Sequence, residues 1–98
     1  MTKADIVSSI SGKTGIVRKD VALAVDAFLG SVIDSLKEGK HIEIRGFGTF
    51  NIRERKPHIG RNPKSGIKVE VPARITPTFK FSKLLKQEVS KANQDKLL

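Results

Sequence analysis

The stretch HIGRNPKSGI, residues 58 to 67, has the composition of a hairpin turn, with two glycines, an asparagine and a proline among polar and basic side chains. These are the residues whose backbone preferences suit tight turns. Pro63 has no N–H and cannot donate to a strand ladder, and its polar neighbours do not suit burial in a core. We therefore expect Pro63 to lie at an exposed tip and to meet something outside the chain.

The segments on both sides of this turn alternate between apolar and polar residues, with the period of two that indicates β-strands. An earlier alternation runs through Ile42, Ile44, Phe50 and Ile52, and glycines interrupt it at residues 46–48. It predicts a hairpin that turns at these glycines. After residue 66, apolar residues occupy every odd position: Ile67, Val69, Val71, Ala73, Ile75, Pro77, Phe79 and Phe81. This pattern predicts one strand over residues 67–81, which is long by ordinary standards.

The four prolines all lie between residues 57 and 77, at Pro57, Pro63, Pro72 and Pro77. Proline is tolerated in strands at free edges and bulges, not in the middle of a sheet. Residues 53–74 are therefore expected to form a two-stranded arm with both outer edges unpaired. Ten residues of strand reach about 30 Å, so Pro63 is expected at the far end of a long projection.

Helical periodicity occurs on either side of these strands. Thr2 and Asp5 form a capping-box-like pair at the start of a first helix, which Gly12 and Gly15 are expected to end. A longer helix is predicted from one apolar stripe: Val21, Val25, Phe28, Leu29, Val32 and Leu36. Lys37 and Gly39 follow as stop signals. A short third helix is expected from Ser82, and residues 91–98 are expected to form a frayed polar tail.

These elements predict an α+β fold in a single domain, residues 1–98. Its body is expected to comprise residues 1–52 and 75–90, and its arm residues 53–74. A body of roughly 70 residues is too small to bury a large apolar load by itself. A symmetric dimer with interlocked cores is therefore expected, and its core is predicted to contain four of the five phenylalanines: Phe28, Phe47, Phe50 and Phe79.

The net charge of +9 is concentrated in one part of the sequence. Residues 51–86 carry ten Lys or Arg against two Asp or Glu, so this segment holds eight of the nine excess positive charges. Such a segment repels itself unless a polyanion binds it, which favours nucleic acid over an anionic membrane. The candidate arm contacts are Arg53, Arg55, Lys56, Arg61, Asn62, Lys64, Lys68 and Arg74.

Other classes of function find little support. The chain has no cysteine for disulfides or thiolate metal sites, and His41 and His58 are isolated, so no metal or cofactor is expected. Residues 11–14, SGKT, match half of a phosphate-binding loop, but Val7 stands where that motif needs glycine. No nucleophile, base and orienter come together, so we do not expect an enzyme. No apolar run approaches a membrane span, and we expect a soluble intracellular protein.

Three motifs carry a family resemblance: GFGTF at residues 46–50, GRNPKSG at residues 60–66, and the stretch from Pro77 through Phe79 to Leu85. In these, the chain resembles the bacterial histone-like HU and integration host factor family over roughly residues 1–90. The resemblance implies an intertwined dimer with a helical base, a saddle-shaped antiparallel sheet and two extended β-ribbon arms that wrap the minor groove.

The resemblance also implies roles for single residues. Arg61 and Asn62 match residues that enter the groove, and Pro63 matches a wedge that intercalates between base pairs. The body residues expected at flanking phosphates are Lys3, Lys80, Lys83 and Lys86. Two positions depart from the family pattern: Ser82 replaces a usual glycine, and Val17 stands where a capping Ser or Thr is common.

The expected function is that of a cytoplasmic, nucleoid-associated protein that bends and compacts chromosomal duplex DNA with little sequence specificity. A sequence-specific role like that of integration host factor is the alternative within this class. A basic RNA-binding protein is the alternative outside it, although a proline-tipped ribbon is less expected for the narrow, deep major groove of RNA. The partner chain is expected to be an identical copy, with a paralogue as the alternative.

Overall fold

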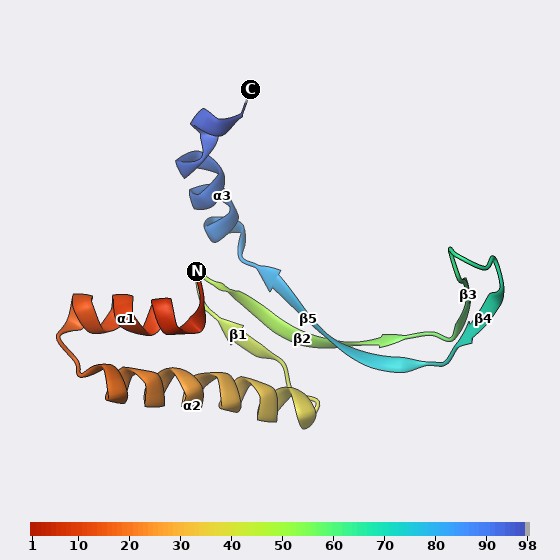
Figure 1. Cartoon of the computed structure of the whole chain (residues 1–98), viewed down its shortest axis with the longest axis horizontal. Helices are drawn as coiled ribbons and strands as arrows, with labels where there is room; N and C mark the ends of the chain where they lie inside the picture. The colour runs from red at the N-terminus through yellow and green to blue at the C-terminus, as the bar shows by residue number, and fades with distance from the viewer. Residues whose placement is uncertain (98) are drawn as a thin grey trace.

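The computed structural model describes residues 1–97, which form three α-helices, one 3₁₀ turn and two antiparallel sheets, so the predicted α+β class is confirmed. The molecule is extended rather than compact (Figure 1), with a radius of gyration of 19.1 Å. A compact chain of this length would have a radius of gyration of about 13 Å. Two long excursions, a ribbon and a C-terminal helix, leave the main body (Figure 1).

Helix α1 spans Lys3–Thr14 and begins with the predicted capping box. The Asp5 N–H donates to Thr2 Oγ1 over 3.2 Å, and the Thr2 N–H donates to Asp5 Oδ2 over 2.9 Å. The bond from the Thr2 backbone is the main cause that holds the pKa of Asp5 below its ordinary value. The prediction that Gly12 ends the helix was wrong, because the helix continues to Thr14, whereas Gly15, with a φ of 76°, caps it as predicted.

Helix α2 spans Arg18–Lys37 and lies beside α1 (Figure 1). Val17 precedes it without a side-chain cap, as its apolar side chain predicts. The helix stops at the predicted point, followed by Gly39 with a φ of 79°. Three valines are the buried apolar side chains among the described residues: Val7 on α1, and Val21 and Val32 on α2.

The larger sheet has the strand order β1-β2-β5, with strands Ile42–Ile44, Gly48–Arg55 and Arg74–Phe81. The predicted hairpin joins β1 to β2. In its turn, the Phe47 N–H donates to the Ile44 carbonyl over 2.9 Å, and Gly46 has a φ of 80°. A positive φ at this position is the requirement of a type II turn, which glycine meets.

The smaller sheet pairs β3, His58–Arg61, with β4, Lys68–Val71. It continues the pairing of β2 with β5 in the same register: Arg55 lies opposite Arg74, and His58 lies opposite Val71. Strand geometry is interrupted at residues 56–57 and 72–73, where the ribbon turns (Figure 1). The single strand predicted over residues 67–81 was therefore wrong, because Pro72 and Ala73 divide it.

Helix α3 spans Lys83–Ala92 and is capped by Ser82, whose Oγ accepts from the Leu85 N–H over 3.1 Å. The Ser82 N–H donates to the Phe47 carbonyl over 2.8 Å, which ties the start of α3 to the β1–β2 turn. The 3₁₀ turn η1, Gln94–Lys96, follows. The prediction of a frayed tail from residue 91 was wrong for residues 91–92 and 94–96, and Leu98 lies outside the described residues.

Candidate nucleic-acid interface

The ribbon tip is built around Asn62, which makes three hydrogen bonds within the loop. Its N–H donates to the Ile67 carbonyl over 2.9 Å, and its own carbonyl accepts from the Gly66 N–H over 2.7 Å. Its side-chain Oδ1 accepts from the Lys64 N–H over 2.9 Å, in the manner of an Asx turn. Gly66 adopts a φ of 72°, which completes the reversal. These bonds fix the turn that contains Pro63, which is exposed.

The cations predicted to contact nucleic acid are distributed along both strands of the ribbon. Arg55 lies directly opposite Arg74, and Arg61 lies directly opposite Lys68. Like charges placed opposite one another destabilise a pair of strands. Arg53, Lys56 and Lys64 are also exposed. These opposed like charges destabilise the ribbon, and a bound anion would relieve their repulsion.

Among residues 1–97, no carboxylate forms a salt bridge with these cations. Within residues 1–97 the salt bridges are Lys3 with Asp26, at 2.7 Å, and Lys40 with Glu38, at 2.9 Å. Neither involves a cation of the ribbon. Lys3, which is predicted to contact phosphate, is paired with Asp26 in an exposed salt bridge.

The other predicted body contacts lie on and beside α3. Lys80 is exposed near the end of β5, and Lys83 and Lys86 are exposed in the first turns of α3. Lys83 and Lys86 line one shallow groove, whose other cation is Lys91. The sequence analysis missed Lys91 because it assigned this residue to a frayed tail. The 3.6-residue period continued from Ser82 to residue 92 would have placed it on α3.

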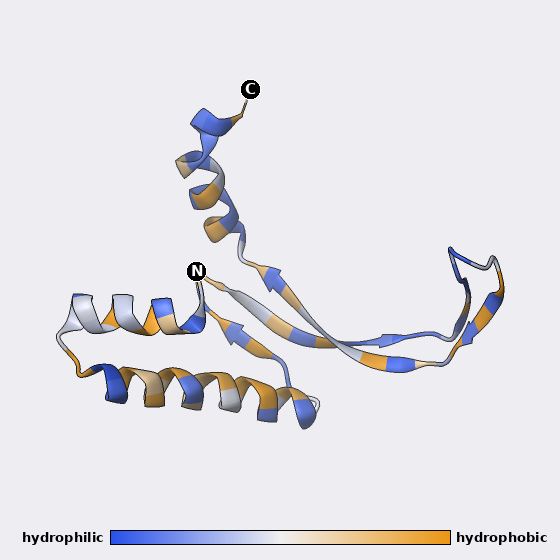
Figure 2. Ribbon diagram, viewed as in Figure 1, coloured by the Kyte–Doolittle hydropathy of each residue, from blue (hydrophilic) through white to orange (hydrophobic). Residues whose placement is uncertain are grey.

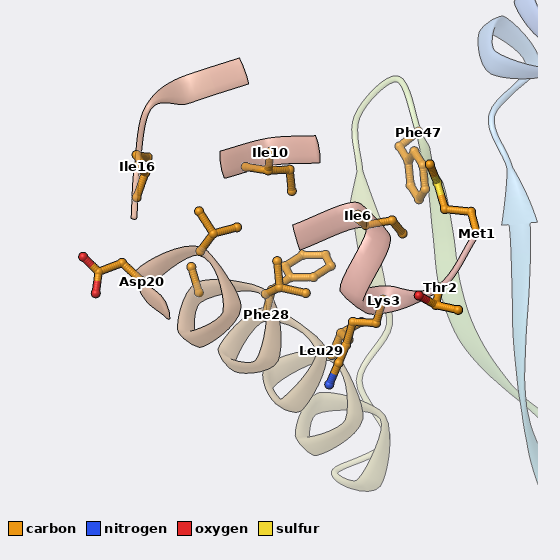
Figure 3. Close-up of a pocket in the computed structure, with 13 residues that line it drawn as sticks. Met1, Thr2, Lys3, Ile6, Ile10, Ile16, Asp20, Phe28, Leu29 and Phe47 are labelled. Atoms are coloured by element: carbon orange, nitrogen blue, oxygen red, sulfur yellow. The ribbon is translucent and has the colours of Figure 1, made fainter. Parts of the chain in front are cut away.

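Apolar grooves are a second exposed feature of the molecule. In Figure 2, hydrophobic residues recur along α1, α2 and α3, although little of this surface is enclosed. A groove of about 710 Å³ runs between α1 and α2, and Figure 3 shows Ile6, Ile10, Phe28 and Leu29 around it, with Phe47 at one end. Phe28 remains 51% exposed and Phe47 remains 44% exposed. The single chain therefore does not cover these rings.

Four phenylalanines, Phe47, Phe50, Phe79 and Phe81, form a cluster on the larger sheet. Phe50 lies opposite Phe79 in the register, with ring centroids 4.5 Å apart, and Phe47 lies 5.6 Å from Phe79. Phe81 joins the cluster at 4.8 Å from Phe79. Phe81 was absent from the predicted dimer core, although the alternation placed it on the same strand face as Phe79. Phe28 lies on α2, apart from the cluster, and reaches Phe47 only across the large groove.

Two further features bear on the class of protein. Among residues 1–97, no three His, Asp or Glu side chains gather in a way that could hold a metal ion. Over the same residues, none of the helices combines the length and the apolar character needed to cross a membrane.

The family profile described as "Bacterial DNA-binding protein" matches residues 1–90. The chain belongs to this family. Its relatives are the HU and integration host factor proteins, so the family expected from the GFGTF and GRNPKSG motifs is confirmed.

Members of both branches are similar to the chain. Integration host factor subunit beta of Nitrosospira multiformis is 42% identical over 94 residues, covering 95% of this chain and 100% of that protein. DNA-binding protein HU-1 of Halalkalibacterium halodurans is 40% identical over 90 residues, covering 92% and 100%. Among solved structures, the Anabaena HU–DNA cocrystal structure is similar to this chain, with a TM-score of 0.85 at 34% identity. The match covers 92% of this chain and 98% of the Anabaena chain.

Proposed function

We propose that the chain acts on the bacterial chromosome as an architectural protein that binds duplex DNA in the minor groove and bends it by inserting Pro63. One observation carries the proposal: a ribbon of unneutralised cations ends in a loop whose hydrogen bonds present a proline at its outer end. Cations suit the negative potential of a narrow minor groove, and an apolar wedge suits insertion between base steps.

Bending the duplex has a free-energy cost that contacts of both the ribbon and the body must offset. Unstacking one base step costs a few kcal/mol, and Pro63 contributes a rigid ring that has little side-chain entropy to lose. Bending the duplex brings its flanks toward the body, where Lys80, Lys83 and Lys86 contact phosphates and offset this cost. Arg61 contacts the groove beside the wedge, and Asn62 holds the loop in shape.

The acting form is proposed to be a dimer of two identical chains, with an arm from each. The exposed surface of the chain is 8585 Å², whereas a compact monomer of this mass exposes about 5,500 Å². A second copy placed against the α1–α2 groove and the phenylalanine cluster would cover much of the apolar excess. Integration host factor subunits stand among the relatives beside HU, so a paralogous partner is the competing assembly.

The arm is proposed to bind with little sequence specificity, because the minor groove distinguishes mainly A·T from G·C pairs. Sequence-specific bending is the second candidate, since identity to an integration host factor subunit, 42%, is as high as that to HU-1, 40%. Affinity measured on random duplexes and on duplexes selected by the protein separates the two. A selected sequence bound a thousandfold more tightly would favour the second candidate.

The test of the wedge is Pro63→Ala, with Ser65→Thr as a matched control in the same loop, because threonine keeps the hydroxyl that accepts from the Ile67 N–H over 3.3 Å. Bending is measured by energy transfer between dyes at the two ends of a random duplex. We expect Pro63→Ala to bend the duplex less and to lose most of the preference for nicked DNA, while Ser65→Thr behaves as the parent. If Pro63→Ala bends the duplex as sharply as the parent, Pro63 only shapes the turn.

A further inference from the structure

The ribbon carries a histidine among its lysines and arginines. His58 lies on β3, the strand that leads to the Pro63 loop, and it is exposed directly opposite Val71. The other histidine of the chain, His41, lies just before β1 in the body. Imidazole is the side chain whose charge ordinarily changes between pH 5 and pH 8. The charge of the ribbon can therefore change within this range at His58.

One ring nitrogen of His58 faces the backbone. Its Nδ1 lies 3.4 Å from the carbonyl oxygen of Lys56, a contact that suits a proton on Nδ1 as a weak donor. In a neutral ring with that proton, Nε2 is an acceptor, which repels a phosphate oxygen. A second proton turns Nε2 into a donor and gives the ring a positive charge. Protonation thus converts His58 into a group that can bind phosphate.

One carboxylate shares a cavity with His58. In its two-stranded sheet β3 pairs only with β4, and Glu70 of β4 lines the same cavity of about 420 Å³ at the ribbon bend. The other lining residues are apolar: Pro57, Ile59, Val71 and Pro72. Among residues 1–97, neither His58 nor Glu70 takes part in a salt bridge. The Glu70 carboxylate therefore favours a proton on His58 without fixing the ring.

Cations are more numerous than carboxylates around this cavity. Those nearest to His58 in the pairing of the ribbon are Arg55, Lys56, Arg61, Lys68 and Arg74. In the free chain their positive charge opposes a proton on His58. Phosphates bound along the ribbon would neutralise these cations and add negative charge beside the ring. Bound duplex DNA therefore favours the protonated form of His58 more than the free arm does.

We propose that His58 couples the arm to pH: binding of duplex DNA takes up a proton at His58, and affinity rises as pH falls. This inference rests on the proposed binding of duplex DNA by the ribbon. The coupling is reciprocal, because phosphates that favour the proton are bound more tightly once the proton is present. The bound state holds more protons than the free state, so affinity increases from pH 8.5 to pH 5.5.

The lysines and arginines of the ribbon do not supply this response. Lysine and arginine ordinarily keep their charge throughout this range, and aspartate and glutamate ordinarily keep theirs. The other groups that ordinarily titrate within it are the imidazole of His41 and the amino group of Met1. Both remain in the variant His58→Gln, so comparison of this variant with the parent isolates His58.

The test compares His58→Gln with His41→Gln. Affinity for a random duplex is measured across a salt series at pH 5.5 and at pH 8.5. We expect the slope of log affinity against log salt to be steeper at pH 5.5 by about 0.9 per protomer in the parent, because one more phosphate is contacted. His41→Gln should show the same difference. His58→Gln should keep the shallower slope at both pH values, and His58→Lys should keep the steeper slope at both.

Calorimetry provides a second measurement. Binding heats near pH 7 in two buffers of different ionisation enthalpy give the number of protons taken up. The parent and His41→Gln should take up protons on binding, and His58→Gln should take up fewer.

Three results would overturn the inference. The slope of the parent could be equal at the two pH values, or His58→Gln could retain the full pH dependence. Equal slopes for His58→Lys and His58→Gln would show that a charge at residue 58 does not reach phosphate. A parent protein that binds no duplex at either pH would instead refute the proposed function, so the two failures are distinguishable.

Discussion

At the residue scale, Gly48 is the position where the sheet tolerates no side chain. It is buried at the start of β2, opposite Phe81. A Cβ built there would stand 2.5 Å from the Phe79 ring and 2.6 Å from the Lys80 carbonyl oxygen. The ring could move, but the carbonyl belongs to the strand backbone. The second glycine of GFGTF therefore lets β5 and its phenylalanine approach β2 closely.

Gly48→Ala is expected to destabilise the fold by about 1–3 kcal/mol, the cost of overpacking a filled site. The measurement is the free energy of unfolding by urea at fixed protein concentration. Gly12→Ala is the control, because Gly12 lies within α1 with nothing within 4 Å of a new Cβ. Alanine there should be neutral or stabilising by up to about 1 kcal/mol. Equal stability of Gly48→Ala and the parent would contradict the close approach.

Some single-residue features could be predicted from the sequence and others could not. The polar, glycine-containing turn placed Pro63 at a tip, because turn residues have local backbone requirements. The side-chain hydrogen bond of Asn62 was not predictable in the same way. Its side-chain Oδ1 accepts from the Lys64 N–H within the loop, and the contact of its side chain with the DNA groove stays a prediction. A bond between a side chain and a nearby backbone atom depends on loop geometry that residue type alone does not specify.

At the element scale, the ribbon is one pairing interrupted midway. Continuing the register from Arg55 opposite Arg74 would place Pro57 opposite Pro72. Proline fixes φ and has no N–H, and it also restricts the residue before it. Two prolines opposite one another therefore explain why both strands of the ribbon are interrupted at the same point and why pairing resumes at His58 and Val71.

The double variant Pro57→Thr, Pro72→Thr is expected to join β2 to β3 and β4 to β5, because threonine supplies the missing N–H and favours strands. Slower amide exchange at Lys56 and Ala73, with cross-strand proton contacts between them, would show the join. Pro77→Thr is the control, since Pro77 already lies within β5. Rapid exchange that persists at Lys56 and Ala73 would mean that the prolines are not the cause of the interruption.

The elements that the sequence predicted well are those with strong local signals. The end of α2 followed from Lys37 and Gly39, and the start of α1 followed from its capping box. The alternation over residues 67–81 predicted strand structure, which β4 and β5 have, but it could not reveal the break. Period-two patterning reports which side a residue faces and persists across an interruption that keeps the register.

At the scale of the whole molecule, the chain has more apolar surface than it can enclose. A second apolar groove, of about 280 Å³, lies between α2 and the sheet, and Ile33, Ile52 and Ile75 line it. Ile33 is 52% exposed and Ile75 is 69% exposed. The sequence suggested this deficit through body size and phenylalanine count. The chain that would cover this surface in the proposed dimer could not be predicted, because contacts between molecules are not encoded in any local pattern.

Phe47→Ala is expected to weaken the proposed dimer, because Phe47 lies between the α1–α2 groove and the phenylalanine cluster. The loss should be about 3–5 kcal/mol, as for other large core truncations, and the midpoint of unfolding should rise with protein concentration. Sedimentation equilibrium, together with melts across a concentration series, provides the measurement. A parent chain that is a stable monomer at micromolar concentration would refute the assembly.

The unbroken register of the ribbon also limits how its length can change during evolution. Because paired residues from Gly48 opposite Phe81 to Arg61 opposite Lys68 keep one alignment, one residue inserted into a single strand would turn every side chain beyond it to the opposite face. Insertions of two residues in both strands together preserve the faces and move the tip outward by about 7 Å. Relatives with longer or shorter arms should therefore differ by matched pairs of residues, and designed changes of reach should follow the same rule.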